Sequence, residues 1–373
     1  MPYDIPLRFQ QALVSSASSQ ADLSSARSSN AAPRLADGMP IEIIVGLPGL
    51  SEGPLLARAR ALQLPVLISA NSLSRWRQRD GGREWAGWRL RQLANAHGLA
   101  SIMLDSAGFV LASRYRGLPW TVEDYVDGLA AAYPWRLWAS LDHCVEPEIA
   151  RAREDALERM PRTVRLNIEC HTRAIDAGIV SNFMPVLQGR RPSDYLRCLD
   201  GIAHILRPGQ TIAIGSTCRR AVHGEDGLLA VFETLDRHLD PTVRLHGFGI
   251  KGLALSHLRA FEHRKITVDS SAFSYAARMS ALFNGHVKTN HFVADHMEHW
   301  TERQYVRLAR PRKGFQSSLP LPPAAEPLLT GWEAAVAAAR EEIRTLVIEG
   351  EIAHDQFTDA WIAEWAADLL GRR

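Results

Sequence analysis

The sequence predicts an α/β fold, namely a (β/α)8 barrel of the TIM type with a C-terminal helical appendage. Short apolar runs recur along the chain, the segments between them have helical periodicity, and the last sixty residues leave this rhythm. Strands that alternate with helices pair in parallel, and eight of them can close a barrel. A doubly wound open sheet is the alternative. It would prefer a glycine-rich phosphate loop after its first strand, which residues 46–53 imitate only loosely.

The first expected segment precedes the alternating strands and helices. Residues 1–39 are expected to form a flexible arm, because residues 14–38 are rich in Ser and Ala and offer few large side chains for burial. The expected barrel then covers residues 40–315. Its eight strands are expected at residues 41–46, 65–70, 101–106, 137–142, 183–189, 211–216, 243–249 and 265–270.

Helices are expected between these runs and after them. Apolar spacing predicts helices at residues 146–160 and 193–206, the second opened by Ser193 as its N-cap. Residues 74–93 interleave six arginines with three tryptophans. This pattern fits either a nucleic-acid-binding surface or a barrel helix with tryptophan inward and arginine outward. Residues 316–373 are the C-terminal helical segment, with amphipathic helices at 326–350 and 353–371.

Composition excludes several classes of protein. With 46% apolar and 23% charged residues, the chain is typical of a soluble globular protein, and a net charge of +2 does not demand a polyanionic partner. The four cysteines are scattered without a CxxC pair, which argues against a cysteine-based zinc knuckle and a secreted disulfide scaffold. No apolar run has membrane length and no secretion signal is visible, so a cytoplasmic enzyme or binding protein is expected.

Polar side chains stand at the ends of the expected strands. The third, fourth, fifth and eighth runs end in Asp105, Asp142, Gln188 and Asp269. Active-site groups of such barrels lie at the C-terminal ends of strands. Carboxylates gathered in a crevice raise one another's pKa, which separates the roles of acid and nucleophile. The pattern alone therefore predicts carboxylate chemistry, with glycosyl transfer as one possibility.

Six motifs, in order along the chain, resemble those of the tRNA-guanine transglycosylase superfamily over about residues 100–290. They are LDSAGF (104–109), SLDHC (140–144), PVLQG (185–189), AIGS (213–216), LHGFGIKG (245–252) and VDSSAF (268–273). The tRNA enzymes bind zinc through cysteines after the nucleophile, whereas this chain has no cysteine after Cys218, and Ala107 replaces a glycine of the first motif. These departures resemble the DNA-acting 7-deazaguanine transglycosylase branch.

The resemblance implies a pentosyltransferase that exchanges guanine in a nucleic acid, DNA rather than tRNA, for a 7-deazaguanine base through a covalent aspartyl intermediate. Asp269 would be the nucleophile and Asp105 the general acid and base. The implied substrate-binding residues are Asp142 and Gln188, which would read the guanine edge, Gly215, which would donate a backbone N–H, Phe109, which would stack on the base, and Gly189, Ser216 and Gly247. By their pattern alone, the ends of the sixth and seventh runs, at residues 215–216 and 247–249, are places where a ligand could approach the backbone closely.

No metal or cofactor is expected, although a metal shared by histidines of the 286–299 stretch (His286, His291, His296 and His299) is the alternative. The expected partners are a nucleic acid, the deazaguanine base and a helicase-like protein, with no membrane. Three other functions stay open: an enzyme that acts on tRNA, a small-molecule glycosidase or lyase, and a catalytically inactive barrel that binds nucleic acid as a subunit. The presence of all three acids speaks against the last.

Overall fold

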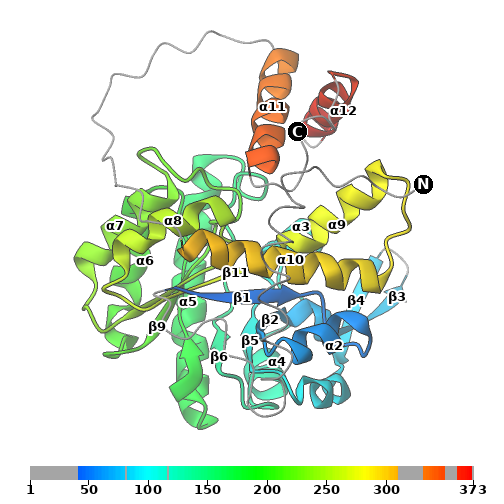
Figure 1. The fold of residues 1–373 in the computed structure, drawn as a ribbon. Helices are drawn as coiled ribbons and strands as arrows, with labels where there is room; N and C mark the ends of the chain where they lie inside the picture. Colours follow the sequence, from blue (N-terminus) through cyan, green and yellow to red (C-terminus); the bar gives the residue numbers. More distant parts are fainter. Residues whose placement is uncertain (1–40, 80–81, 116, 310–330, 349–358, 372–373) are drawn as a thin grey trace. The chain divides into compact units, whose positions relative to one another are not determined.

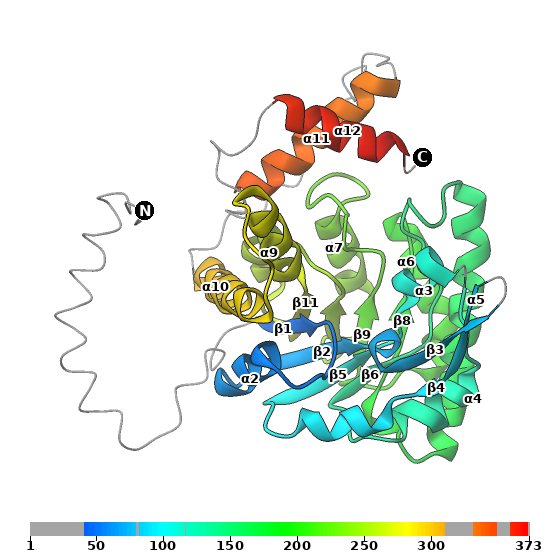
Figure 2. The same ribbon diagram turned by 90° about the vertical axis from the view of Figure 1, so that its right-hand side faces the viewer.

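Residues 41–79, 82–115, 117–309, 331–348 and 359–371 are described by a computed structural model of the chain. In this part of the chain, parallel strands form a nearly closed barrel of the TIM type with helices around it (Figure 1, Figure 2), as the sequence predicted. The strands of the barrel are β1 (Ile41–Leu47), β2 (Pro65–Ser69), β5 (Ser101–Asp105), β6 (Leu137–Ala139), β7 (Phe183–Met184), β8 (Val186–Leu187), β9 (Thr211–Ile214), β10 (Arg244–Gly247) and β11 (Ile266–Ser270).

The sheet returns on itself at Pro185. Its strands follow the order β7-β6-β5-β2-β1-β11-β10-β9-β8, so its two ends, β7 and β8, are successive pieces of one expected strand. Pro185 divides them because proline has no N–H to give to a ladder. Its carbonyl still accepts a hydrogen bond from the Ala213 N–H at 2.8 Å. All eight expected runs are therefore strands, with the fifth in two pieces.

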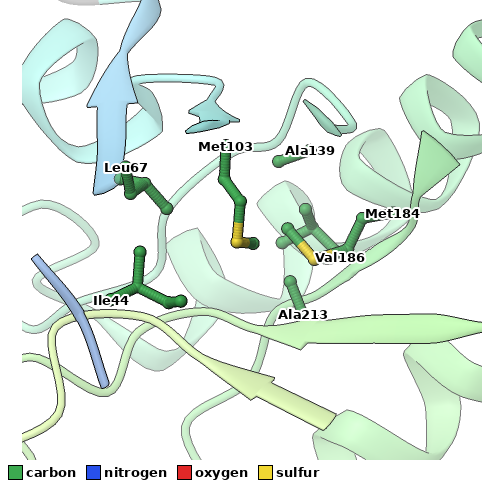
Figure 3. Packing of buried hydrophobic residues seen from close by; sticks show 7 residues of the cluster. All are labelled: Ile44, Leu67, Met103, Ala139, Met184, Val186 and Ala213. Carbon is green, nitrogen blue, oxygen red and sulfur yellow. The ribbon is translucent and has the colours of Figure 1, made fainter. Parts of the chain in front are cut away.

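The interior of the barrel is filled by side chains, as in other barrels of this type. One apolar residue from each of seven strands points to a common centre, shown in Figure 3: Ile44, Leu67, Met103, Ala139, Met184, Val186 and Ala213. All seven are buried. This layer closes the barrel below the C-terminal ends of the strands, where a ligand would have to bind.

Helices cover the strands on the outside. They are α2 (Pro54–Ala61), α3 (Gly108–Tyr115), α4 (Val122–Tyr125), α5 (Arg153–Asp176), α6 (Pro192–Ile202), α7 (Leu228–His238), α8 (Leu255–Leu258), α9 (Ala272–Phe283) and α10 (Asn290–Ala309). Helix α10 packs against α2 and β1, and Arg58 of α2 forms ion pairs with Asp295 and Glu298 of α10.

Two of the expected helices differ from the structure. The helix expected at 146–160 begins only at Arg153. It continues through Pro161 to Asp176, because α5 buries Met160, Asn167 and other residues along one face. This packing outweighs the missing hydrogen bond of the proline. The prediction that Ser193 is an N-cap is also wrong, since α6 begins at Pro192 and Arg191 holds the N-cap position. The Asp194 carboxylate accepts hydrogen bonds from the N–H groups of Arg190 and Arg191, just before the helix.

Residues 74–79 and 82–88 form two paired strands, a hairpin, so of the two alternatives for residues 74–93 the barrel helix is wrong. Strands β3 (Ser74–Arg79) and β4 (Gly82–Trp88) pair antiparallel, with a bulge between Ser74 and Trp76. Trp76 stacks on Tyr115 of α3, with ring centroids 3.9 Å apart. The hairpin thus leaves the barrel a few residues after Ser69, at the C-terminal end of β2, with its arginines exposed.

The C-terminal segment contains α11 (Gly331–Ile348) and α12 (Asp359–Gly371), close to the two helices expected there. They bury a small apolar cluster of their own, formed by Ala335, Ala339, Ile343, Ile362 and Ala366. The expected arm at residues 1–39 lies outside the described residues. None of the described helices combines the length and hydropathy needed to cross a bilayer.

Candidate active site

A cavity of about 600 Å³ opens at the C-terminal ends of the barrel strands. Asp105, Asp142, Gln188 and Asp269 all line it, although they come from four different parts of the sequence. The volume is in the range of sites for small ligands and exceeds what one purine base needs, so part of an attached sugar can enter as well. The structure thus brings together all four polar residues that the strand ends predicted.

Asp269 lies near the end of β11 and is buried, with 8% of its surface exposed. Its Oδ1 atom accepts a hydrogen bond from the Gly249 N–H at 3.1 Å. Its Oδ2 atom accepts none from the described residues, and this carboxylate lines the cavity. One oxygen is therefore anchored and the other is free to attack a ligand.

A fully buried histidine, His246, stands beside Asp269 and was not predicted. Its Nδ1 atom lies 2.8 Å from the Thr267 hydroxyl, and its Nε2 atom lies 3.3 Å from Asp269 Oδ1 without the alignment of a hydrogen bond. Residues 267 and 269 alternate along β11 and so face the same side of the sheet. The imidazole therefore packs against the Asp269 carboxylate.

Asp105 ends β5, and its Oδ2 atom accepts a hydrogen bond from the Ala107 N–H at 3.1 Å. Burial, together with the nearby carboxylates of Asp142 and Asp269, raises the pKa of Asp105 from 3.8 to about 7. A carboxyl group with such a pKa can give and take a proton near neutral pH. Ala107 adopts a left-handed backbone with φ of 73°, which glycine adopts without strain.

A chain of hydrogen bonds, which we call the cavity chain, connects Ser106, Asp142, Gln188 and Ser216. The Ser106 hydroxyl donates to Asp142 Oδ1, Gln188 Nε2 donates to Asp142 Oδ2 at 2.5 Å, and the Ser216 hydroxyl donates to Gln188 Oε1 at 2.6 Å. These bonds fix the orientation of the Gln188 amide. Burial raises the pKa of Asp142, and the bonds from Ser106 and Gln188 oppose this shift.

Two glycines make room for this chain. A Cβ atom at Gly108 would lie 2.7 Å from both carboxylate oxygens of Asp142, and one at Gly215 would overlap the amide of Gln188. However, the Gly215 N–H donates to the Leu187 carbonyl at 2.9 Å as part of the sheet. The expectation that it donates to a base is therefore wrong for this structure, because the ladder between β8 and β9 already uses it.

The other expected binding residues divide into two groups. Phe109 and Ser216 line the cavity. Gly189 and Gly247 are not among the described residues that line it, and both allow close packing of the chain instead. A Cβ at Gly189 would overlap Tyr195, and a Cβ at Gly247 would lie 2.7 Å from Ile250.

The cavity also has lining residues that had not been assigned a role in the site from the sequence. Gly249, in the same motif as Gly247, anchors Asp269 and packs against Cys218. Glu146 lines the cavity with 3% of its surface exposed, in a loop that the sequence had assigned to a helix. The only sign in the sequence that Glu146 could lie near the site was its distance of four residues from Asp142. Assigning it to a helix hid this sign.

The histidines considered as metal ligands lie in and before α10. His296 packs against Phe292 with ring centroids 4.5 Å apart, and His299 Nδ1 lies 2.8 Å from the Asp295 carbonyl. Within the part of the chain that the structure describes, no group of three or more His, Cys, Asp or Glu side chains is arranged to hold a metal ion.

Comparison with known proteins identifies the family. A family model described as DpdA, DeoxyPurine in DNA protein A, matches residues 85–348, which include every strand from β5 to β11 and all four polar residues of the cavity. A search of curated proteins found no match. Because the model covers well over half of the chain, the protein belongs to the DpdA family, the DNA 7-deazaguanine transglycosylases.

Proposed function

We propose that this chain exchanges guanine in DNA for a 7-deazaguanine base by two successive displacements at C1′ of the deoxyribose. The observation that carries the proposal is the pairing of two unlike carboxyl groups in one cavity. Asp269 offers a free Oδ2 atom, whereas the pKa of Asp105 is raised to about 7. One group can act as a nucleophile while the other holds a proton.

In the first displacement, Asp269 Oδ2 attacks C1′ and the bond from C1′ to guanine N9 breaks. Asp105 gives its proton to the departing guanine, so that the base leaves as a neutral molecule. The Gly249 N–H at 3.1 Å from Oδ1 orients the attacking carboxylate. The result is an ester between Asp269 and the sugar, with Asp105 ionised.

The second displacement reverses these roles. The Asp105 carboxylate takes the N9 proton of the incoming deazaguanine, and N9 attacks C1′ while the ester to Asp269 breaks. Each displacement inverts C1′, so the two together retain its configuration. No proton or electron is gained or lost over the cycle, and Asp105 is protonated again for the next turnover.

The cavity chain of Ser106, Asp142, Gln188 and Ser216 fits the Watson–Crick edge of guanine. The Asp142 carboxylate can accept from N1–H and the N2 amino group. Gln188 Nε2 carries two hydrogens, and only one of them is used by Asp142, so the second can bond O6 of the base. Phe109 lines the cavity where it can contact the face of the base.

Within the described residues, the cavity ends at the apolar layer of the barrel and is open only at its mouth. A base that is still stacked in a duplex cannot enter such a cavity. The target nucleotide must therefore be extruded or lie in a single strand. A helicase-like partner that opens the duplex would supply this state. The substrate DNA is expected to lie in the cytoplasm.

The direct test is release of guanine. Purified protein should release labelled guanine from single-stranded DNA when a 7-deazaguanine base is added, and the same base should enter the DNA in equal amount. Matched tRNA with labelled guanine serves as the comparison. Release from tRNA but not from DNA would contradict the proposal.

The arginines of the β3–β4 hairpin should contribute to DNA binding. Arg75, Arg77 and Arg79 alternate along β3, which directs them to one face, and all three are exposed. Replacing all three by Gln should weaken binding of single-stranded DNA and reduce the slope of log K against log salt by roughly 2, because each phosphate contact contributes about 0.7. Binding titrations at several salt concentrations measure both changes.

The matched control uses three exposed arginines at the opposite end of the barrel, namely Arg207, Arg237 and Arg244. They precede or begin strands, or end α7, and therefore lie away from the cavity. Their replacement by Gln removes the same charge and should leave the salt slope nearly unchanged. Equal losses in the two triple variants would mean that only net charge matters, and the hairpin would have no special part.

A further inference from the structure

The described strands β10 and β11 contribute no residue to the apolar layer inside the barrel, whose seven members come from the other strands. In the register of the sheet, His246 of β10 is paired with Ala213 of β9, a member of that layer, and with Thr267 of β11. Side chains at paired positions of neighbouring strands point to the same face of a sheet. His246 and Thr267 thus form a polar pair in the interior, where the other strands place apolar residues.

His246 uses one ring nitrogen and leaves the other without a partner. The residue is fully buried, and its Nδ1 atom lies 2.8 Å from the Thr267 hydroxyl. Its Nε2 atom has no hydrogen-bond partner among the described residues, although Asp269 Oδ1 lies only 3.3 Å away. A buried polar atom without a partner costs free energy, which an apolar side chain at this position would avoid. The cost disappears if Nε2 gains its partner during the reaction.

The surroundings of the imidazole favour a hydrogen on Nε2. Without one, the lone pair of Nε2 would face the Asp269 oxygen, and the two would repel each other. The Thr267 hydroxyl can donate to Nδ1, which fixes this tautomer. The ring of Phe248 lies edge-on to the imidazole, with centroids 4.8 Å apart and an angle of 84°, and holds it in place. Hydrogen bonds of catalytic groups are often poorly aligned until the substrate binds.

We propose that His246 is a positioning residue that donates a hydrogen bond from Nε2 to Asp269 Oδ1 during the reaction, and that it thereby favours release of the sugar from Asp269. The proposal rests on the proposed function and assigns a role to a residue outside the two carboxyl groups. The Gly249 N–H already donates to the same oxygen at 3.1 Å. Oδ1 would therefore have two donors while Oδ2 forms and breaks its bond with C1′.

Two donors on Oδ1 affect the two displacements differently. In the ester, Oδ1 is a neutral carbonyl oxygen, whereas in the free carboxylate it shares a negative charge, and hydrogen bonds to a charged oxygen are stronger. The donors therefore stabilise the carboxylate more than the ester. In the second displacement, N9 of the incoming base bonds C1′, the bond from C1′ to Oδ2 breaks, its electron pair returns to the carboxylate, and the N9 proton passes to Asp105. His246 favours this step and so limits the time for which DNA stays attached to the protein.

The test measures the equilibrium between attached and free protein. Protein is incubated with end-labelled single-stranded DNA and increasing concentrations of guanine, and the attached fraction is read from a denaturing gel. Guanine reverses the first displacement, so the guanine concentration that halves the shifted band reports the stability of the ester relative to the carboxylate. His246→Met keeps a similar volume but removes the donor. In this variant the concentration should rise roughly 10-fold or more, the size of a lost hydrogen bond to a charged group.

Three further variants separate the hydrogen bond from other effects. His246→Gln is the conservative change, since its amide can donate toward the same oxygen, and it should need nearly the wild-type concentration of guanine. Thr267→Val keeps the shape of the side chain but removes the hydroxyl that fixes the tautomer, so it should shift the concentration in the same direction by a smaller factor. His238→Met, at an exposed residue that ends α7, is the matched control and should titrate like the wild type.

A purely structural role of His246 predicts the opposite sign, because a displaced nucleophile gives less attached DNA at every guanine concentration. A weaker band in His246→Met, an unchanged guanine concentration, or a His246→Gln variant that shifts as far as His246→Met would each overturn the proposal. If His246→Met does not fold, Thr267→Val decides, and a wild-type value in that variant would overturn the proposal as well. A wild type that gives no shifted band at all would instead contradict the proposed function.

Discussion

Replacing Asp269 by Asn should abolish covalent attachment of the protein to DNA and slow base exchange by roughly 10⁴-fold or more, as expected when a nucleophile is removed. The change keeps the size of the side chain, and the Asn oxygen can still accept the hydrogen bond of the Gly249 N–H. Folding should therefore be preserved. The amide, however, cannot form the ester on which both displacements depend.

The measurement is a denaturing gel of protein incubated with end-labelled single-stranded DNA, followed by mass spectrometry of the linked peptide. Wild type should give a shifted band attached through residue 269, and the variant should give none. Asp200, an exposed residue of α6, offers the matched control, and Asp200→Asn should keep the band. A linkage through Asp105 or Asp142 would reverse the assignment of roles, as would normal turnover in Asp269→Asn.

Replacing Asp105 by Asn should slow exchange by roughly 10²–10⁴-fold, because departing guanine loses its proton donor. The free enzyme needs Asp105 protonated for the first displacement. Since burial and the neighbouring carboxylates raise its pKa to about 7, wild-type kcat/KM for DNA should fall as the pH rises through 7. In Asp105→Asn the residual rate should lack this decline. A decline that persists unchanged in the variant would show that another group titrates.

Stability gives a second measure of the same group. Below about pH 4 both the folded and the unfolded chain hold the Asp105 proton. Between pH 4 and 7 the unfolded chain releases it while the folded protein keeps it, so the free energy of unfolding of the wild type should decrease as the pH rises. The loss should level off above about pH 7, on the order of a few kcal/mol. Asp105→Asn, unfolded with urea at pH 5 and pH 8, should show a smaller difference.

Much of the fold was predictable because of how parallel strands are buried. A strand covered on both faces reads as a continuous apolar run, and residues 43–45 or 66–68 stand out for that reason. The acids of the site were predictable because they interrupt such runs at their ends. Predicting Asp105 and Asp269 as site residues required no knowledge of side-chain contacts. It required only the rule that the C-terminal ends of parallel strands meet at the same end of a barrel.

What failed depended on contacts between distant segments. Helical periodicity at residues 146–160 suggested one helix, but a turn in which Ile149 and Ala150 donate to the Glu146 carbonyl precedes α5. That error concealed Glu146. The Gly215 N–H looked available until pairing of β9 with β8 supplied its acceptor. His246 reads as an ordinary strand residue, and only the register of β10 against β11 places it beside Thr267 and Asp269.

The closure of the sheet through β1 has a consequence for synthesis of the chain. The first strand pairs with both β2 and β11, so one edge of β1 stays open until residues 266–270 have left the ribosome. By then Asp105, Asp142 and Gln188 have long been made, but the strand that brings the nucleophile is the same one that covers the open edge. An incomplete chain therefore exposes a strand edge prone to aggregation, and it lacks Asp269. Competence to attack a deoxyribose should arise only in the folding step that seals the barrel.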